Sequence, residues 1–383
     1  MEAKSLVPKL RFRGFKEYWE ENKLGDIATF YNSKRVALTA SDREKGEYPY
    51  YGASGIIDYV KDFIFEGEYI LLGEDGANIV MRNSRLVFLA KGKFWLNNHA
   101  HIFQSKDSNA FLCEALERIN YTKYNTGTAQ PKLNSDVVKK IKLKLPSLPE
   151  QQKIASFLTS VDNKINLLTK KKALLETYKK GVMQKIFSQE IGFKDEEGND
   201  YPNWEEKRLL DFCKFFSGGT PTSTNMEYYT GKIPFIGSGN IYDTEVFSFI
   251  SEEALASSSA KLVKKGDLLY ALYGANSGES AISKLEGAIN QAILCIRSKE
   301  SDDFLNYLLV LNKDKIVVKY LQGGQGNLSA QIIKKLKYKI PSIVEQNKIA
   351  SFLSSIDKKI ELVDFQLERN KEFKKGLLQQ MFV

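Results

Sequence analysis

The chain has 383 residues, a formal net charge of +9, 43% hydrophobic residues and 27% charged residues. This length predicts two or three domains, and this composition is typical of a protein that folds in water. No run of 18 apolar residues occurs and the first residues lack the apolar core of a secretion signal, so we expect no membrane span and a cytoplasmic location.

Two globular parts are predicted, over residues 1–145 and 191–340. Each contains short or alternating apolar runs between glycine and polar turns, which predicts strand-rich domains with a few helices. Residues around Trp19 return around Trp204 at an offset of 185, but the stretches Lys34–Tyr48 and Ser217–Lys232 share almost nothing. A repeated frame with different loops is what two recognition modules with different targets would look like.

Charge is unequal between these parts. Residues 1–145 carry 23 basic and 18 acidic residues, whereas residues 191–344 carry 18 basic and 19 acidic residues. A basic balance favours nucleic acid as a partner, so the second part would need a local basic patch to bind DNA.

The strongest repeat begins at Pro146 and returns at Pro341. At this constant offset of 195 the copies share 20 identical residues in 43 aligned positions, so we infer an internal duplication. Each copy opens with Ser-x-x-Glu, the signature of a capping box at a helix start. Apolar residues then recur every seven positions, which is typical of a coiled-coil seam. We predict two helices of about 40 residues, each about 60 Å long, within 146–190 and 341–383.

Two polar residues interrupt this seam. Lys172 stands where the other copy has Leu367, and Asn370 stands where the first copy has Leu175. Our interpretation is that each faces an apolar residue of the partner copy, which suits two antiparallel helices of one chain packing on each other. The alternative is that the two helices only hold a core.

Residues that could carry catalysis or bind a metal are sparse. His99 and His101 would share a face of a strand, but no third ligand is near them in sequence, so we predict no metal site. The three cysteines are single and far apart, which excludes a disulfide framework and predicts buried thiols. The glycine pairs lack the lysine of a phosphate loop, and no Pro-Pro occurs for the loop of an amino-methyltransferase. We predict no catalytic residue and no cofactor on this chain.

A loop rich in glycine and amide side chains precedes each long helix, over Asn125–Ser135 and Gln322–Ala330. Amides can pair with base edges, and glycine lets backbone N–H groups reach phosphates. The alternative is that the loops only turn the chain into the strands VVKKIKLKLP and IIKKLKYKIP. The candidate DNA-binding residues are Lys34, Arg35, Thr126, Thr128, Gln130, Lys132, Thr220, Thr222, Gln322, Gln325 and Asn327.

The KLRFxGFxxxW opening, the GTxQ loop and the PxxPEQxKIAxFL helix, in a doubled arrangement, resemble the specificity (S) subunit of type I restriction–modification enzymes over nearly the whole chain. One departure is Val344 in place of Pro149, which matters little because proline there only pre-sets a helical dihedral. The resemblance implies an α+β fold, with two target recognition domains separated by a pair of long antiparallel coiled-coil helices. It also implies that each recognition domain reads one half of an asymmetric bipartite site in double-stranded DNA.

The resemblance further implies a non-catalytic chain whose helices act as a spacer and dock two modification (methyltransferase) subunits. S-adenosylmethionine would act on those subunits, and ATP and magnesium on restriction subunits that join through the complex. Two alternatives remain: a stand-alone DNA-modifying enzyme with S-like arms, and a coiled-coil scaffold without a DNA role. The expected docking and coiled-coil residues are Ile154, Phe157, Leu158, Val161, Ile165, Leu168, Ile349, Phe352, Leu353, Ile356, Ile360 and Val363.

Overall fold

The computed structural model describes residues 7–321 and 327–383. The chain divides into two compact units: residues 1–169 with 365–383 form unit 1, and residues 170–364 form unit 2. Each unit contains strands, short helices and part of both long helices, which confirms the predicted α+β class. The domain limits predicted from the sequence separate the long helices from the globular parts, whereas each compact unit includes part of both helices. Those limits therefore stay a prediction.

Unit 1 is built on a six-stranded sheet in the order β2-β7-β5-β6-β3-β4, and β1 and β8 form a separate two-stranded sheet. All neighbouring strands run antiparallel except β3 and β6, which are parallel. The strands are β1 (Glu20–Lys23), β2 (Ala28–Phe30), β3 (Lys45–Gly52), β4 (Gly55–Val60), β5 (Phe65–Gly73), β6 (Val87–Leu96), β7 (Ala100–Ser105) and β8 (Lys142–Leu145). The short helices are α1 (Leu24–Ile27), α2 (Asn78–Met81), α3 (Asn109–Glu117) and α4 (Ser135–Lys139).

Unit 2 has two four-stranded sheets, β10-β17-β14-β15 and β12-β11-β16-β13, and a two-stranded sheet of β18 and β9. The strands are β9 (Glu205–Arg208), β10 (Cys213–Ser217), β11 (Ile233–Ile236), β12 (Phe249–Ile250), β13 (Lys261–Val263), β14 (Leu268–Ala271), β15 (Ser280–Ile282), β16 (Gly287–Ile289), β17 (Ile293–Ser298) and β18 (Lys337–Ile340). The short helices are α6 (Leu209–Phe212), α7 (Glu252–Ser257) and α9 (Ala330–Lys334), and α8 (Asp302–Leu321) is longer.

The two units share one strand order, but unit 2 interrupts it. In unit 1, β5 and β6 pair along their whole length and face each other at Gly67 and Gly92, both with positive φ. In unit 2 the same two strands are each broken in two, so that β13 pairs with β16 and β14 pairs with β15. The break is a turn at Gly266, whose N–H donates to the carbonyl of Ser283. Gly266 also has positive φ, so glycine at these positions permits continuous strands in unit 1 and a turn in unit 2.

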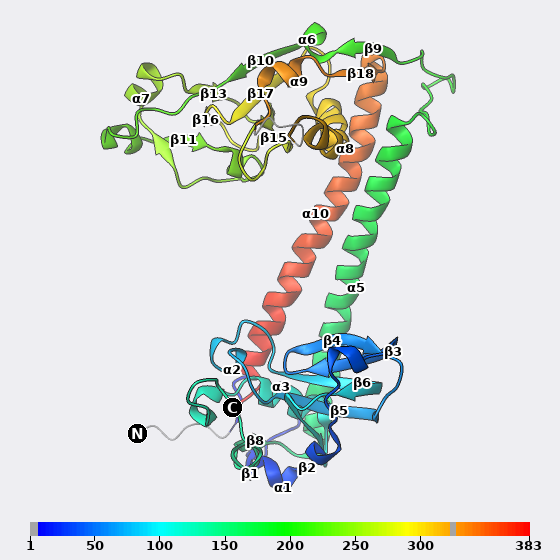
Figure 1. The fold of residues 1–383 in the computed structure, drawn as a ribbon, viewed down its shortest axis with the longest axis vertical. Coiled ribbons are helices and arrows are strands. Elements are labelled where there is room, and N and C mark those ends of the chain that lie inside the picture. The colour runs from blue at the N-terminus through cyan, green and yellow to red at the C-terminus, as the bar shows by residue number, and fades with distance from the viewer. Residues whose placement is uncertain (1–6, 322–326) are drawn as a thin grey trace. The chain divides into compact units, whose positions relative to one another are not determined.

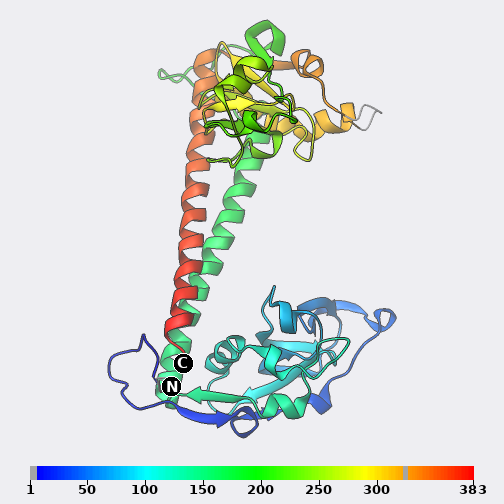
Figure 2. The same ribbon diagram turned by 90° about the vertical axis from the view of Figure 1, so that its left-hand side faces the viewer.

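The two predicted long helices are confirmed as α5 (Leu148–Phe187) and α10 (Ile343–Gln380), and they lie side by side in each unit (Figure 1). In unit 2, Lys172 pairs with Asp364 and Lys179 pairs with Asp357, each at 2.5 Å. The α5 number rises by seven while the α10 number falls by seven, so the helices run antiparallel (Figure 2). In unit 1 the matching ion pair joins Asp162 to Lys374 at 2.6 Å.

The interpretation of the polar interruptions is wrong. Lys172 does not face an apolar residue, because its ammonium group pairs with Asp364. The corresponding positions of the other copy hold Leu367, which is buried, and Thr169, so a leucine and a threonine take the place of an ion pair. Asn370 is partly exposed and donates to the carbonyl of Gln366 on its own helix.

The long helices begin at the predicted residues, but the predicted capping box is incomplete. The Ser342 hydroxyl accepts a hydrogen bond from the Glu345 backbone N–H at 3.4 Å. Neither glutamate carboxylate returns to its cap, because each is buried and binds a group from the segment before β1 or β9. Glu150 accepts two hydrogen bonds from Arg11 at 2.7 Å, and Glu345 accepts one from Trp204 Nε1 at 3.1 Å.

An aromatic trio holds the end of one long helix in each unit. In unit 1, Trp19, Phe111 and Phe382 lie with ring centroids 5.2 to 6.3 Å apart. The same trio recurs in unit 2 as Trp204, Phe304 and Phe187, with centroids 5.4 to 6.2 Å apart. Such edge and stacked contacts add to the burial of large apolar surfaces, so each unit fixes a helix end to its globular part in the same way.

The segments VVKKIKLKLP and IIKKLKYKIP are not strands throughout. Their first halves form the helices α4 and α9, and only their second halves form β8 and β18. A helix starts there because Ser329 caps α9 with its side chain, accepting from the Ile332 N–H, and Asn134 stands at the corresponding cap of α4 in an extended conformation. The apolar pairs Val137–Val138 and Ile332–Ile333 then place one buried residue each against the unit.

Candidate nucleic-acid interface

The glycine- and amide-rich loop of unit 1 is held at both ends by backbone hydrogen bonds. The Leu133 N–H donates to the Glu74 carbonyl at 2.7 Å, directly after β5. Within the loop, Asn125 Oδ1 accepts from the N–H groups of Gly127 and Lys132 at 3.0 and 2.8 Å. The loop is therefore preorganised, with its tip at Thr128 and Gln130 exposed.

Unit 2 holds its corresponding loop at the same place. The Leu328 N–H donates to the Leu272 carbonyl at 3.1 Å, directly after β14. Leu133 and Leu328 are both fully buried, so each acts as an apolar anchor for its loop. Gln322 and Gln325 lie outside the described residues, and Asn327 is exposed.

A charged cluster lies beneath the loop of unit 1. The Glu74 carboxylate contacts Arg35 at 2.6 Å, Lys132 at 3.6 Å and His101 at 3.7 Å. Burial alone would raise the pKa of Glu74, but the hydrogen bond from Arg35 and the surrounding positive charge outweigh it and lower that pKa. Burial lowers the pKa of His101, whose Nε2 lies 2.7 Å from the Leu133 carbonyl. The cluster thus positions the loop through the ion pair of Glu74 with Arg35 and the contact of His101 with the Leu133 carbonyl.

The two histidines contact neighbouring polar groups of unit 1, and the three cysteines are buried. His99 Nδ1 lies 2.8 Å from Asp75, and His101 is buried against Asn32 and the loop. Cys113, Cys213 and Cys295 are free and buried, and burial raises the pKa of each thiol to about 12. In the ranges 7–321 and 327–383, no group of three or more His, Cys, Asp or Glu residues is placed to hold a metal ion.

The candidate DNA-binding residues fall into two groups. Arg35 is committed to Glu74 and to the carbonyls of Asn32 and Ala100, so we leave it out of the proposed interface. The Thr126 hydroxyl donates to the Lys132 carbonyl, and that of Thr220 donates to Gln291 at 2.6 Å. Candidates with exposed side chains are Lys34, Thr126, Thr128, Gln130, Lys132, Thr220, Thr222 and Asn327.

Sequence reasoning missed a set of exposed apolar side chains on the parts that differ between the units. In unit 1 they lie on β4, an edge strand: Ile56, Ile57 and Tyr59. In unit 2 the side chain of Phe247 is 92% exposed, and Met226 is 73% exposed. Exposed apolar groups on a DNA reader can contact thymine methyl groups or wedge between base steps. In unit 1, the sequence run GIIDYV on an edge hairpin could have indicated these exposed apolar side chains.

The variable part of unit 2 is acidic. Residues 220–260 contain one lysine, Lys232, against the five carboxylates Glu227, Asp243, Glu245, Glu252 and Glu253. Lysines of this unit stand instead on α8, α9 and β18: Lys315, Lys319, Lys334, Lys335, Lys337 and Lys339. The local basic patch expected for DNA binding in unit 2 stays a prediction.

Most of the predicted docking and coiled-coil residues are buried within their own unit. Ile154, Leu158 and Val161 pack in the core of unit 1, and Ile349, Leu353 and Ile356 pack in the core of unit 2. They hold the helices and are not free to dock a partner. The large apolar residues that the described parts of the long helices do expose are Leu148, Leu167, Phe365 and Phe373 in unit 1 and Leu174, Tyr178, Ile343, Val344 and Leu362 in unit 2.

Comparisons with known proteins agree with this duplicated architecture. The family model described as the type I restriction modification DNA specificity domain matches residues 16–177 and again residues 201–369. A relative is the type I restriction enzyme MjaVIII specificity subunit of Methanocaldococcus jannaschii, 27% identical over 94% of this chain and 91% of that protein. A putative type I specificity subunit of Haemophilus influenzae is 28% identical over 88% of this chain and 87% of its own length.

Solved structures show the same fold. The S subunit of a type I restriction–modification system from M. genitalium matches 98% of this chain and 99% of its own, with a TM-score of 0.70 at 17% identity. A chain from a study of complex assembly in the type I system matches with a TM-score of 0.53 at 14% identity. In the described ranges, no helix of this protein is long and apolar enough to cross a membrane.

Proposed function

Because the chain belongs to the type I restriction–modification DNA specificity family, we propose that it selects the DNA sequence on which a type I complex acts. Each unit reads one half of a bipartite site in double-stranded DNA. The observation that carries this proposal is the contrast within the duplicated frame. Strand order, helix start and aromatic trio repeat between units, while Lys34–Tyr48 and Ser217–Lys232 do not.

Exposed groups on each unit supply the two kinds of contact that DNA reading needs. Lysines such as Lys34 and Lys132 in unit 1 fit phosphate contacts, which position a protein without sequence information. Amide, hydroxyl and apolar groups such as Gln130, Thr222 and Phe247 fit base edges in the grooves. Gln130 matches Gln325 of the other copy, but Lys132 matches Asn327, and the stretches Lys34–Tyr48 and Ser217–Lys232 share almost nothing, so the two half-sites are expected to differ in sequence.

The complex would supply the chemistry. In this proposal two methyltransferase subunits, which bind S-adenosylmethionine, assemble on this chain. Restriction subunits that use ATP and magnesium join through them. The chain itself would be non-catalytic and would act in the cytoplasm.

Sequencing of methylated DNA tests the proposal. A host that carries this chain with its methyltransferase subunits should gain methylation at one bipartite motif, and deletion of this gene should remove that motif. The two halves should be unlike, and a perfect palindrome would contradict the assignment of different readers. The stand-alone enzyme alternative predicts that the purified chain binds S-adenosylmethionine by itself, and the scaffold alternative predicts no DNA mobility shift with or without methyltransferase subunits.

We further propose that the long helices set the gap between the half-sites. Inserting four residues into α5 between Leu168 and Lys179, and four at the positions 195 later in α10, adds about 6 Å to both helices. At about 3.4 Å per base pair this should lengthen the unread gap by one to two base pairs. An insertion into one helix alone shifts the seam and should abolish activity. An unchanged gap after the paired insertions would assign the spacing to the methyltransferase subunits.

A further inference from the structure

Each unit has a pocket where one long helix ends, and the two pockets are built from matching residues. We call them the helix-end pockets. The pocket of unit 2 has a volume of about 560 Å³, and that of unit 1 about 740 Å³. Six pairs of identical residues line both pockets: Gln184 and Gln379, Phe187 and Phe382, Trp204 and Trp19, Glu206 and Glu21, Lys337 and Lys142, Lys339 and Lys144.

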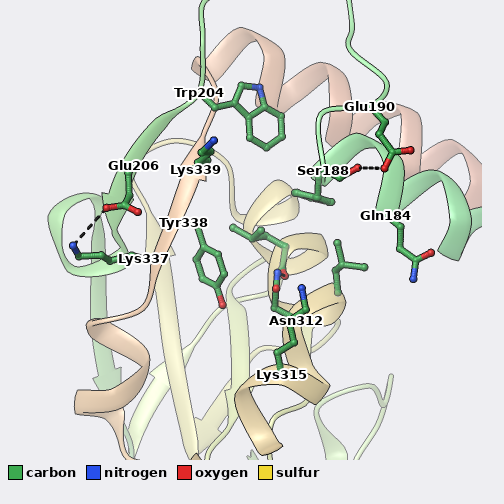
Figure 3. Close-up of a pocket in the computed structure, with 13 residues that line it drawn as sticks. Gln184, Ser188, Glu190, Trp204, Glu206, Asn312, Lys315, Lys337, Tyr338 and Lys339 are labelled. Atoms are coloured by element: carbon green, nitrogen blue, oxygen red, sulfur yellow. Dashed lines mark hydrogen bonds and ion pairs between the residues drawn. The ribbon is translucent and has the colours of Figure 1, made fainter. Parts of the chain in front are cut away.

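The pocket of unit 2 combines apolar and basic side chains. Figure 3 shows Trp204 and Lys339 on one side of it, and Asn312 and Lys315 on α8 at another. Phe187 and Leu308 contribute apolar surface. Trp204 and Phe187, two members of the aromatic trio that fixes the helix end, thus also form a wall of the pocket, which makes the pocket a preformed part of the unit.

Positive charge in this pocket exceeds what its own carboxylates neutralise. Glu206 lies 3.5 Å from Lys337 (Figure 3), but Lys315 and Lys339 have no ion pair within the described residues. A second hollow of about 340 Å³ continues along α8 and β18, and adds Lys319 and Lys335. In unit 1, Lys142 pairs with Glu21 at 2.7 Å, and the exposed Lys9 and Arg118 bring further positive charge.

The pockets belong to the repeated frame and not to the variable loops. Their Trp, Phe, Glu and Lys residues are identical in both units, so the occupant should be the same in both. The two DNA half-sites are expected to differ, which argues against base reading here. A DNA duplex, whose major groove alone is about 12 Å wide, could touch only the rim. A few side chains of a protein segment match a volume in this range.

We propose that each helix-end pocket docks a segment of one methyltransferase subunit that carries carboxylates beside aromatic or aliphatic side chains. The apolar side chains would pack on the Trp and Phe wall, and the carboxylates would pair with the lysines of β8 or β18. One pocket per unit accounts for two copies of one partner. This inference rests on the proposed function, which supplies a partner present twice.

The test compares charge reversals in the full chain, purified with the methyltransferase subunits of its own system and measured by mass photometry without DNA. Lys315→Glu with Lys339→Glu alters the pocket of unit 2, and Lys9→Glu with Lys144→Glu alters that of unit 1. Lys265→Glu with Lys284→Glu is the control, because these exposed lysines of unit 2 lie outside the pocket. Lys315→Gln with Lys339→Gln removes the same charges without introducing carboxylates and guards against misfolding.

Each pocket variant should leave one methyltransferase subunit bound where the wild type binds two, with affinity for the other weakened roughly 100-fold. The four-site combination should bind none, the Gln variant should weaken binding less, and the control should bind two. Pocket variants that melt like the wild type and still bind two subunits would overturn the inference, as would normal assembly with weakened DNA binding. A wild-type chain that binds no methyltransferase subunit would instead overturn the proposed function.

Discussion

The two units differ most informatively at the first turn of their long helices. Phe12 packs on Phe157 in unit 1, and Phe193 packs on Phe352 in unit 2, each pair with centroids 5.6 Å apart, so the two preceding segments correspond. The residue before Phe12 is Arg11, whereas the residue before Phe193 is Gly192. The buried Glu150 of unit 1 therefore has an arginine partner, and the equivalent Glu345 of unit 2 has none.

This difference changes the electrostatics of the two carboxylates. Glu150 is fully buried and receives two charge-assisted hydrogen bonds from Arg11, which are among the stronger interactions a protein makes. Glu345 is 4% exposed and receives a single hydrogen bond from Trp204 Nε1. Burial raises the pKa of Glu345, and the Trp204 hydrogen bond offsets only part of that rise. The same motif residue thus pairs with an arginine in unit 1, whereas in unit 2 it meets a single indole N–H and its pKa is raised.

The largest expected effect comes from removing the arginine. Arg11→Met should lower the free energy of unfolding of unit 1 by about 3 kcal/mol, because it leaves the Glu150 carboxylate buried without a counterion. Hydrogen exchange measured through urea titration should show the loss in unit 1. Lys9→Met, at an exposed neighbouring position, is the control and should change little. A loss below about 1 kcal/mol for Arg11→Met would show that solvent reaches Glu150.

The matched tryptophans should respond differently to loss of their N–H group. Trp204→Phe removes the one donor to Glu345 and should destabilise unit 2 by about 1 to 2 kcal/mol. Trp19 Nε1 is buried with no hydrogen-bond partner in the described structure, so Trp19→Phe should lose only packing and cost less. Thermal unfolding of the two variants compares them directly. Equal losses would mean that packing and not the hydrogen bond to Glu345 dominates.

A pH dependence should distinguish the units. The pKa of Glu345 is raised in the folded protein above its ordinary value of 4.5, so the folded state binds more protons than the unfolded state above pH 4.5. The contribution of Glu345 to stability therefore falls as pH rises from 4.5 through the folded pKa. Glu345→Gln should remove this loss and make unit 2 more stable than the wild type at pH 7.5. The free energy of unfolding of the wild type and of Glu345→Gln, measured at pH 5 and at pH 7.5, checks this prediction. A variant that loses more unfolding free energy than the wild type between pH 5 and pH 7.5 would contradict it.

The smallest effect concerns the ion pair that only one copy carries. Replacing Lys172 by Leu and Asp364 by Thr gives unit 2 the residues that unit 1 has at Leu367 and Thr169. Both side chains of the pair are partly exposed, and such pairs contribute about 0 to 1 kcal/mol. The double variant should match or slightly exceed the wild type in thermal stability. Asp364→Thr alone should be less stable than the double variant, because it removes the ion pair with Asp364 while keeping the charge of Lys172.

Several features followed from sequence because they depend on local rules. The starts of α5 and α10, the seven-residue repeat and the offsets of 185 and 195 are set by periodicity and by capping residues close in sequence. The equivalence of Trp19 and Trp204 also held, since β1 and β9 follow them at the same distance. These signals identified the family and the two-unit architecture before any contact was known.

Other features depend on contacts between residues far apart in sequence. Arg11 meets Glu150 across 139 positions, and Arg35 meets Glu74 across 39, so neither pair could be assigned from spacing. The sequence predicted that Glu150 completes a capping box, whereas the structure places it in a buried ion pair with Arg11. The structure also gives Arg35 a contact with Glu74 that its sequence neighbours did not indicate. Only the tertiary structure decided these roles, because a charged side chain takes whichever partner the fold brings within reach once water is excluded.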